Sequence, residues 1–263
     1  MSKKNNNKIK VGIIGTGNCA KSLVEGVQYY AEHTDAKTGV MKMDIGGYMA
    51  GDVEFVIGFD IDERKTGLPL GEALKQKPNC SWNIVDTIKS TAPVFEAPVI
   101  DGYAGLMDNY PEENRFLVCE KLRNSTDMNR VSWTSKLERK WKDKVIKELK
   151  ARKVEVLVNY LPVGSQKTTE FWAEICLETG ISFVNCIPVF IASDPVWEQR
   201  FIDAGIPLIG DDMRSQFGAS IVSQMLQELA FERGHHVKAH IQRNVGGNTD
   251  FLNMEDKNRL ASK

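Results

Sequence analysis

The stretch Ile9-Lys-Val-Gly-Ile-Ile-Gly15-Thr-Gly17-Asn-Cys-Ala20 predicts a strand, a tight turn and the start of a helix. Its first half is a short apolar run of the kind found in buried strands, and Gly15 closes it. Apolar residues then recur with the i, i+3, i+4, i+7 spacing of one helix face, at Ala20, Leu23, Val24 and Val27. We therefore expect a β-turn-α unit at the N-terminal end of the fold.

The glycine spacing of this turn, G-x-G-x-x-A over residues 15–20, is typical of a dinucleotide-binding site. Gly15 permits the tight turn, Gly17 lets the backbone approach a pyrophosphate, and Ala20 lets the helix pack closely on the strand. The amides and the dipole of the helix N-terminus favour the phosphate charge. A turn needed for packing alone is the alternative, and the position between a strand and a helix favours the dinucleotide.

A second apolar run, Val53 to Asp60, predicts the next strand and ends on a carboxylate. A carboxylate at this place in a dinucleotide-binding sheet binds the adenosine ribose, which favours NAD over its 2′-phosphorylated form. An insertion before this strand makes the spacing longer than the usual ~20 residues after the glycines. NAD is therefore the expected cofactor, with Gly15, Gly17 and Asp60 among its ligands.

Strands and helices continue to alternate in the order of an α/β protein with a Rossmann-like, doubly wound parallel sheet. Ser165 is expected to cap one helix and Gly180 to end it. The alternation over 236–243 predicts a half-buried antiparallel strand. Further strands are expected at 154–160, 182–186 and 207–209, and further helices at 135–146 and 215–232.

The pattern changes near residue 211, which predicts two domains. Residues 1–210 are the expected nucleotide-binding domain, with a helical insertion at about 111–150. Residues 211–263 are the expected start of a second, α+β domain for catalysis and tetramerisation, incomplete in this chain. The charged run inside the insertion is typical of a solvated helix face.

Composition excludes several classes of function. The 263 residues carry 34 basic and 35 acidic side chains, a net charge of −1, so nucleic-acid binding is disfavoured. The apolar run after the basic N-terminus is too short for a signal peptide, and no stretch has the ~20 apolar residues of a membrane helix. Five cysteines without a C-x-x-C pair indicate reduced thiols in the cytoplasm. The four histidines have no metal-ligand spacing, so no metal is expected.

Polar residues follow the later strands, where ligands bind in parallel sheets. Asp194-Pro195 fits a ligand site and an ordinary turn equally well. In the pair Asp211-Asp212, Asp212 could bind a ligand or could cap the next helix. Residues 244–250 offer amides and a carboxylate to a polyhydroxylated ligand, and a plain hairpin loop is the alternative. These residues alone leave each of these alternatives open.

Taken together, these motifs resemble those of the bacterial and archaeal myo-inositol-1-phosphate synthases along nearly the whole chain. The shared motifs are Val11-Gly-Ile-Ile-Gly-Thr-Gly-Asn-Cys-Ala20 with Gln28-Tyr-Tyr30, Tyr160-Leu-Pro-Val-Gly-Ser165, Asn185-Cys-Ile-Pro-Val-Phe-Ile-Ala-Ser-Asp-Pro-Val-Trp197, Gly210-Asp-Asp-Met-Arg-Ser215 and Asn244-Val-Gly-Gly-Asn-Thr-Asp-Phe-Leu-Asn-Met254. The combination is far more specific than the glycine spacing alone.

The resemblance implies an NAD-dependent isomerase that converts D-glucose 6-phosphate to 1D-myo-inositol 3-phosphate for inositol and phospholipid biosynthesis. In that chemistry NAD takes a hydride from C5, the C6 enolate closes onto the C1 aldehyde, and the retained NADH reduces C5 again. Cations stabilise the enolate oxygen. A homo-tetramer is also implied.

The resemblance further implies roles for individual residues, with Trp172 near the nicotinamide and Lys263 matching the first lysine of the motif S-K-x-I-S-K. The implied catalytic residues are Asp212, Asn248 and Lys263. The implied cofactor-binding residues are Gly15, Gly17, Asn18, Asp60, Trp172, Ser215, Asp250 and Lys263.

Two departures qualify these implications. Arg214 replaces the usual lysine, and a planar guanidinium is a poor substitute in proton transfer. The sequence stops at Lys263, inside the lysine motif, so we expect a truncated chain that retains NAD binding without turnover. A noncatalytic NAD-binding or assembly fragment is one alternative. An NAD-dependent sugar-phosphate dehydrogenase that releases NADH is another.

Overall fold

The computed structural model describes residues 8–36, 38–101, 103–119, 135–213, 218–243, 245 and 249–257. The chain divides into two compact units, Met1–Asp212 with Asn248–Lys263, and Met213–Gly247. The first unit contains the sheet and the segments that pack on it. The expected domain boundary after residue 210 stays a prediction.

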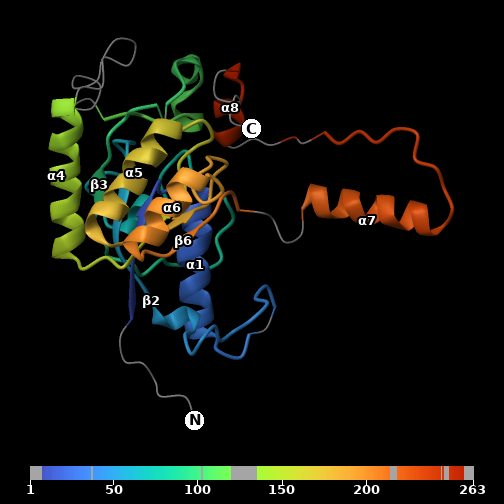
Figure 1. The fold of residues 1–263 in the computed structure, drawn as a ribbon, viewed down its shortest axis with the longest axis horizontal. Coiled ribbons are helices and arrows are strands. Elements are labelled where there is room, and N and C mark those ends of the chain that lie inside the picture. The colour runs from blue at the N-terminus through green and yellow to red at the C-terminus, as the bar shows by residue number, and fades with distance from the viewer. Residues whose placement is uncertain are drawn as a thin grey trace. The chain divides into compact units, whose positions relative to one another are not determined.

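A six-stranded parallel sheet forms the centre of the first unit (Figure 1). Its strands are β1 (Ile9–Ile14), β2 (Val53–Asp60), β3 (Val94–Glu96), β4 (Val156–Asn159), β5 (Ser182–Asn185) and β6 (Leu208–Ile209). They lie in the order β3-β2-β1-β4-β5-β6, with Ile9 beside Val53 and Val11 beside Val156 in the register. The predicted α/β class and doubly wound parallel sheet are thereby confirmed. The sheet order reverses between β1 and β4, which is where such sheets bind ligands.

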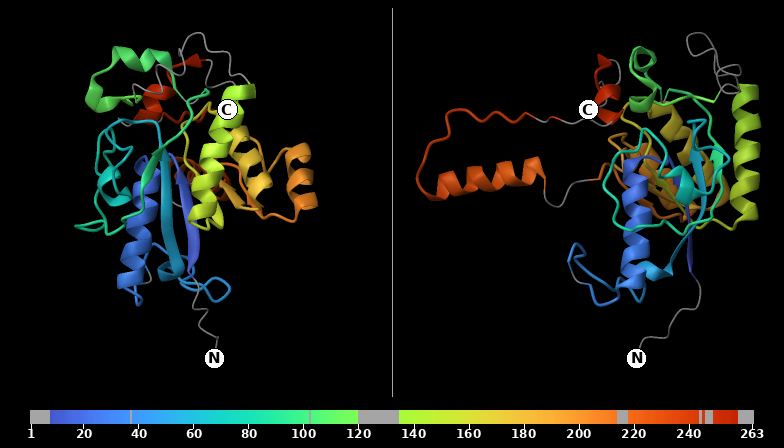
Figure 2. Two further views of the ribbon diagram at one scale, coloured as in Figure 1. Left: turned by 90° about the vertical axis from the view of Figure 1, so that its left-hand side faces the viewer. Right: turned by 180° about the vertical axis from the view of Figure 1, so that it is seen from behind.

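Helices cover both faces of this sheet (Figures 1 and 2). The helices α1 (Asn18–Glu32) and α2 (Leu70–Ala73) pack on one face, in a cluster that contains Ile13. The helices α4 (Ser135–Ala151), α5 (Gln166–Thr179) and α6 (Pro195–Ala204) pack on the other face, in a cluster that contains Ile14. Because successive strand residues point to opposite faces, one apolar run supplies both cores. Short 3₁₀ turns lie at Ala50–Asp52, Gly105–Asn109 and Glu112–Asn114.

Helix ends follow the sequence signals in most cases. Gly180 ends α5 in the left-handed conformation, with φ of 74°, as predicted. Asp194 caps α6, where its Oδ1 accepts from the amides of Val196 at 2.9 Å and Trp197 at 3.1 Å. Asp194-Pro195 therefore begins a helix. The predicted side-chain cap by Ser165 is wrong, because its hydroxyl donates to the carbonyl of Pro162 at 2.6 Å instead.

The second unit contains α7 (Ala219–Glu232), and the first unit also includes α8 (Thr249–Asn253). Gly218 is the N-cap residue of α7, so Asp212 does not cap this helix. The antiparallel strand predicted over 236–243 is wrong, since these residues form no strand. A strand needs a hydrogen-bonding neighbour, and the described part of the chain provides none for this segment. Among the described residues, no helix combines the length and the apolar character needed to cross a membrane.

Candidate functional site

The glycine turn lies at the carboxyl end of β1 and leads into α1. Gly15 has φ of +83°, and a Cβ there would lie 2.7 Å from the carbonyl oxygen of Tyr160, so only glycine fits. Its amide donates to the carbonyl of Phe59 at 2.8 Å, which ties the turn to β2. The turn is therefore held between the ends of β2 and β4.

Gly17 is the N-cap residue of α1, and a Cβ at this position would meet no atom within 4 Å. Within the described residues no side chain caps this helix, and its first turn holds no acidic residue. The first amides of a helix need acceptors, and an anion can supply them. The open backbone at residue 17 and the uncapped amides therefore fit a pyrophosphate.

Asp60 holds the turn from the end of β2. Its Oδ2 accepts from the amide of Thr16 at 2.8 Å and from the Thr16 hydroxyl. Its Oδ1 accepts from the amides of Ile61 at 2.7 Å and Asp62 at 3.0 Å. A carboxylate offers about four acceptor positions. In Asp60 these positions are occupied by the Thr16 hydroxyl and by the backbone amides of Thr16, Ile61 and Asp62. Asp60 thus anchors the turn, and its expected contact with a ribose stays a prediction.

The sequence interpretation missed Lys65, which is fully buried beneath the turn. Its Nζ donates to the carbonyl of Thr16 at 2.9 Å and to Oδ1 of Asn79 at 3.0 Å, and it lies 3.9 Å from Oδ2 of Asp60. Burial lowers the pKa of Lys65. Burial alone would raise the pKa of Asp60, but the charge of Lys65 and the bonds from Thr16 bring it below its usual value. The signal in the sequence was the charged run that follows Asp60, directly after a buried strand.

Asn18, the first residue of α1, binds the segment before β3. Its Oδ1 accepts from the amides of Cys80 at 2.8 Å and Ser81 at 2.9 Å. This expected cofactor ligand therefore uses its side-chain oxygen to fix residues 80–81 beside the turn. A cofactor contact of its amide nitrogen stays a prediction.

The carboxyl ends of β4 and β5 carry a chain of buried amides that leads to Asp211. Nδ2 of Asn159 donates to Oδ1 of Asn185 at 2.9 Å, and Nδ2 of Asn185 donates to Oδ1 of Asp211 at 2.8 Å. The Asp211 carboxylate also accepts from the amides of residues 191–193 at 2.9 to 3.0 Å. Asp211 therefore fixes the loop after β5 and the backbone before Asp212.

We expect Asp211→Asn to lower the free energy of unfolding by about 1.5–3 kcal/mol, because hydrogen bonds to a charged group are lost. The amide group also presents a donor where the carboxylate accepts from backbone amides. Urea unfolding followed by circular dichroism measures the change. Asp203→Asn in α6 is the matched control, since Asp203 is exposed. Equal effects of the two substitutions would contradict the anchoring role.

The expected catalytic residue Asp212 lies exposed at this edge, with φ of +65°, and its amide donates to the carbonyl of Ile187 at 3.1 Å. Burial first, and then the charges of Cys19 and Asp212, raise the pKa of Cys186 to about 11.

The expected cofactor residue Asp250 lies in α8, which is hydrogen-bonded to the loop after β4. Burial first, and then the charge of Asp250, raise the pKa of Cys19 in the first turn of α1. Asn253 of α8 donates to the carbonyl of Val163 at 2.6 Å, and the Thr249 hydroxyl donates to the carbonyl of Asn114 at 3.1 Å. A segment over 200 residues from the glycine turn in sequence thus returns to the same edge of the sheet.

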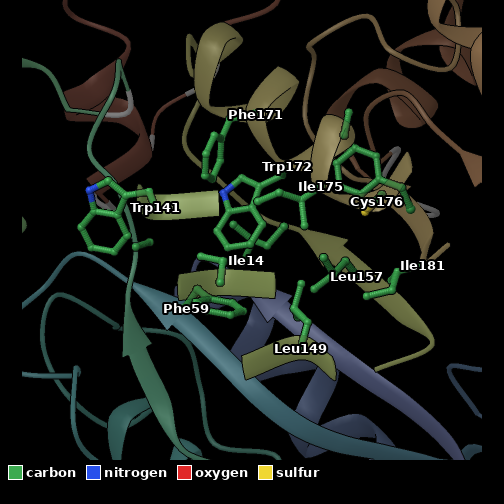
Figure 3. Close-up of a cluster of buried hydrophobic side chains, with 14 of the residues drawn as sticks. Ile14, Phe59, Trp141, Leu149, Leu157, Phe171, Trp172, Ile175, Cys176 and Ile181 are labelled. Atoms are coloured by element: carbon green, nitrogen blue, oxygen red, sulfur yellow. The ribbon is translucent and has the colours of Figure 1, made fainter. Parts of the chain in front are cut away.

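Trp172 lies in the hydrophobic core between α5 and the sheet (Figure 3). It has no exposed surface, and its ring centroid is 4.8 Å from that of Phe59. Its Nε1 is buried without a hydrogen-bond partner among the described residues. The structure therefore gives no support to the expected contact of Trp172 with a cofactor.

The remaining expected site residues, Ser215, Asn248 and Lys263, lie outside the described residues, as does Arg214. Within the described part of the chain, no group of three or more His, Cys, Asp and Glu side chains is placed to hold a metal ion. The described site therefore consists of the glycine turn, its buried supports and the two carboxylates Asp212 and Asp250.

Known proteins resemble this chain in sequence and in fold. The family model of myo-inositol-1-phosphate synthase matches residues 218–263. Inositol-3-phosphate synthase of Corynebacterium glutamicum is 42% identical over 257 residues, which are 97% of this chain and 64% of that protein. Inositol-3-phosphate synthase of Mycobacterium tuberculosis (strain CDC 1551) is 40% identical over 258 residues, with the same coverage. The chain thus spans 64% of the length of these curated relatives.

Two solved structures share the fold. The crystal structure of Ari2 has a TM-score of 0.74 and 28% identity, and the match covers 95% of this chain and 68% of that one. A myo-inositol-1-phosphate synthase-related protein from Thermotoga maritima has a TM-score of 0.69 and 25% identity. This match covers 97% of this chain and 67% of that one.

Proposed function

Since the chain belongs to the myo-inositol-1-phosphate synthase family, we propose that it binds NAD at the glycine turn and serves the conversion of glucose 6-phosphate to inositol 3-phosphate. The observation that carries the proposal is the turn itself. Gly17 leaves open space beside uncapped helix amides, and Asp60 and Lys65 hold the turn from beneath.

When bound at the glycine turn, NAD would supply the oxidising power for reversible hydride transfer with the sugar phosphate. The first amides of α1 hold the pyrophosphate charge. Asp212 and Asp250, at the same edge of the sheet, accept hydrogen bonds from hydroxyl groups of the bound ligands. The ammonium of Lys263 stabilises the enolate oxygen, as the family resemblance implies, and Asn248 orients the sugar.

The exposed apolar side chains of α7 support the further proposal of a homo-oligomer. Large apolar patches on a protein surface mark interaction sites. The exposed large apolar residues of this helix are Val222, Met225, Leu226, Leu229 and Phe231. A cytoplasmic location, with its reduced thiols, completes the proposal.

Gly17→Ala tests the proposed cofactor site. We expect the NAD affinity to fall at least about 10-fold, equal to ~1.4 kcal/mol, because the methyl group occupies the space through which a phosphate approaches the backbone. The thermal midpoint should stay unchanged, since a Cβ at residue 17 meets no atom and its φ is −84°. Titration calorimetry with NAD and thermal unfolding give the two readouts.

Gly26→Ala is the matched control, because Gly26 lies within α1 and a Cβ there also meets no atom within 4 Å. This variant should keep its NAD affinity and gain up to ~1 kcal/mol of stability from helix propensity. An unsubstituted, folded chain that shows no heat with NAD contradicts the proposal. Net NADH accumulation on addition of glucose 6-phosphate would indicate a dehydrogenase instead.

A further inference from the structure

The segment 79–83 before β3 is fixed against the glycine turn and α1. Nδ2 of Asn79 donates to the carbonyl of Thr16 at 3.0 Å. The amides of Cys80 and Ser81 donate to Oδ1 of Asn18, as described above. The first half of the segment is thus bound to the same residues that form the expected phosphate site.

Lys21 fixes the second half of the segment. Its side chain is almost fully buried, and its Nζ donates to the carbonyl of Ser81 at 2.7 Å and to Oδ1 of Asn83 at 2.8 Å. A third, longer contact of 3.4 Å reaches the carbonyl of Trp82. Hydrogen bonds therefore hold the residues on both sides of Trp82, which fixes the backbone position of this residue.

The indole of Trp82, in contrast, is 93% exposed. Tryptophan is highly buried on average, and a large aromatic side chain fully open to water is unusual. Because the loop around it is bound by side-chain hydrogen bonds, the ring is presented on a rigid support beside the glycine turn. A rigid aromatic surface of this kind binds a flat ring at a low entropic cost.

We propose that Trp82 is the stacking surface for the adenine ring of the bound dinucleotide. This inference rests on the proposed NAD function. The pyrophosphate at the start of α1 lies between the two halves of the dinucleotide, and the adenosine half extends toward β2 in such sheets. The start of the segment lies beside the end of β2, because Nζ of Lys65 donates to Oδ1 of Asn79 at 3.0 Å and lies 3.9 Å from Oδ2 of Asp60. Trp82 is therefore on the adenosine side of the turn.

Titration calorimetry of Trp82→Ala and Trp82→Phe with NAD, ADP-ribose and nicotinamide mononucleotide tests the proposal. Base stacking measured by alanine substitution predicts a loss of about 5- to 150-fold for NAD and for ADP-ribose in Trp82→Ala. Trp82→Phe keeps an aromatic face and should lose much less. Nicotinamide mononucleotide should bind all variants equally. Phe231→Ala, at an exposed aromatic residue of α7, is the control and should bind like the unsubstituted chain.

The outcomes separate this inference from the proposed function. Absence of NAD binding by the unsubstituted chain overturns both. NAD binding that is equal in the unsubstituted chain and in Trp82→Ala overturns the stacking role alone. A loss as large in Trp82→Phe as in Trp82→Ala, or a loss confined to nicotinamide mononucleotide, also overturns it. Thermal unfolding of each variant confirms that the fold is intact, which the exposure of residue 82 predicts.

Discussion

Lys65→Met is expected to lower the free energy of unfolding by about 3–5 kcal/mol, because it removes one partner of a buried ion pair. Methionine fills the space of the lysine stem but leaves Asp60 buried without its cation. Oδ1 of Asn79 also loses the donor Nζ, and the carbonyl of Thr16 keeps only the bond from Nδ2 of Asn79. Urea unfolding measures the loss. NAD affinity should fall as well, since Thr16 belongs to the glycine turn.

The matched control is Lys89→Met. Lys89 pairs with Glu32 at 2.8 Å, but its side chain is 71% exposed, so the pair should contribute ~0–1 kcal/mol. In the Lys65→Met background, Asp60→Asn should cost less stability than it does in the unsubstituted chain, because there it also removes an uncompensated charge. Similar losses in Lys65→Met and Lys89→Met would show that Lys65 does not support the turn energetically.

Sequence periodicity was sufficient to predict the strands that helices cover on both faces of the sheet. The predicted and observed strands share the same bounds at Ile9–Ile14 and Val53–Asp60. Both lie inside a parallel sheet that is covered on its two faces, so their sequences are nearly continuous apolar runs. The segment 236–243 failed because alternation specifies a strand face but does not supply a partner strand.

The glycine turn was also predictable, but its supports were not. Thr16 and Asp60 are 44 residues apart in sequence, and Asn18 and Cys80 are 62 apart. No local pattern links residues at such separations. The sequence therefore predicted a carboxylate at the end of β2, and the structure was needed to show that Thr16 and Lys65 engage it.

Trp172 illustrates a different case, in which the family resemblance implied a cofactor contact and the structure places the side chain in the hydrophobic core. Its neighbours come from several elements, including Phe59 of β2 and Phe171 of α5, with ring centroids at 4.8 Å and 5.6 Å (Figure 3). A family resemblance assigns a role to a residue from its place in a sequence motif. The burial of that residue depends on all the helices and strands that surround it. The two interpretations predict different consequences of substitution.

Trp172→Ala should lower the free energy of unfolding by about 3–5 kcal/mol, as expected for a large aromatic residue removed from a core. Trp82→Ala, the same substitution at an exposed position, should change it by no more than ~0.5 kcal/mol. Trp172→Phe keeps most of the packing and removes an indole N–H that has no partner in the described structure, so NAD affinity should be unchanged. A folded Trp172→Phe variant with weakened NAD binding would instead place Trp172 in contact with the cofactor, because a core residue acts on affinity only through the fold.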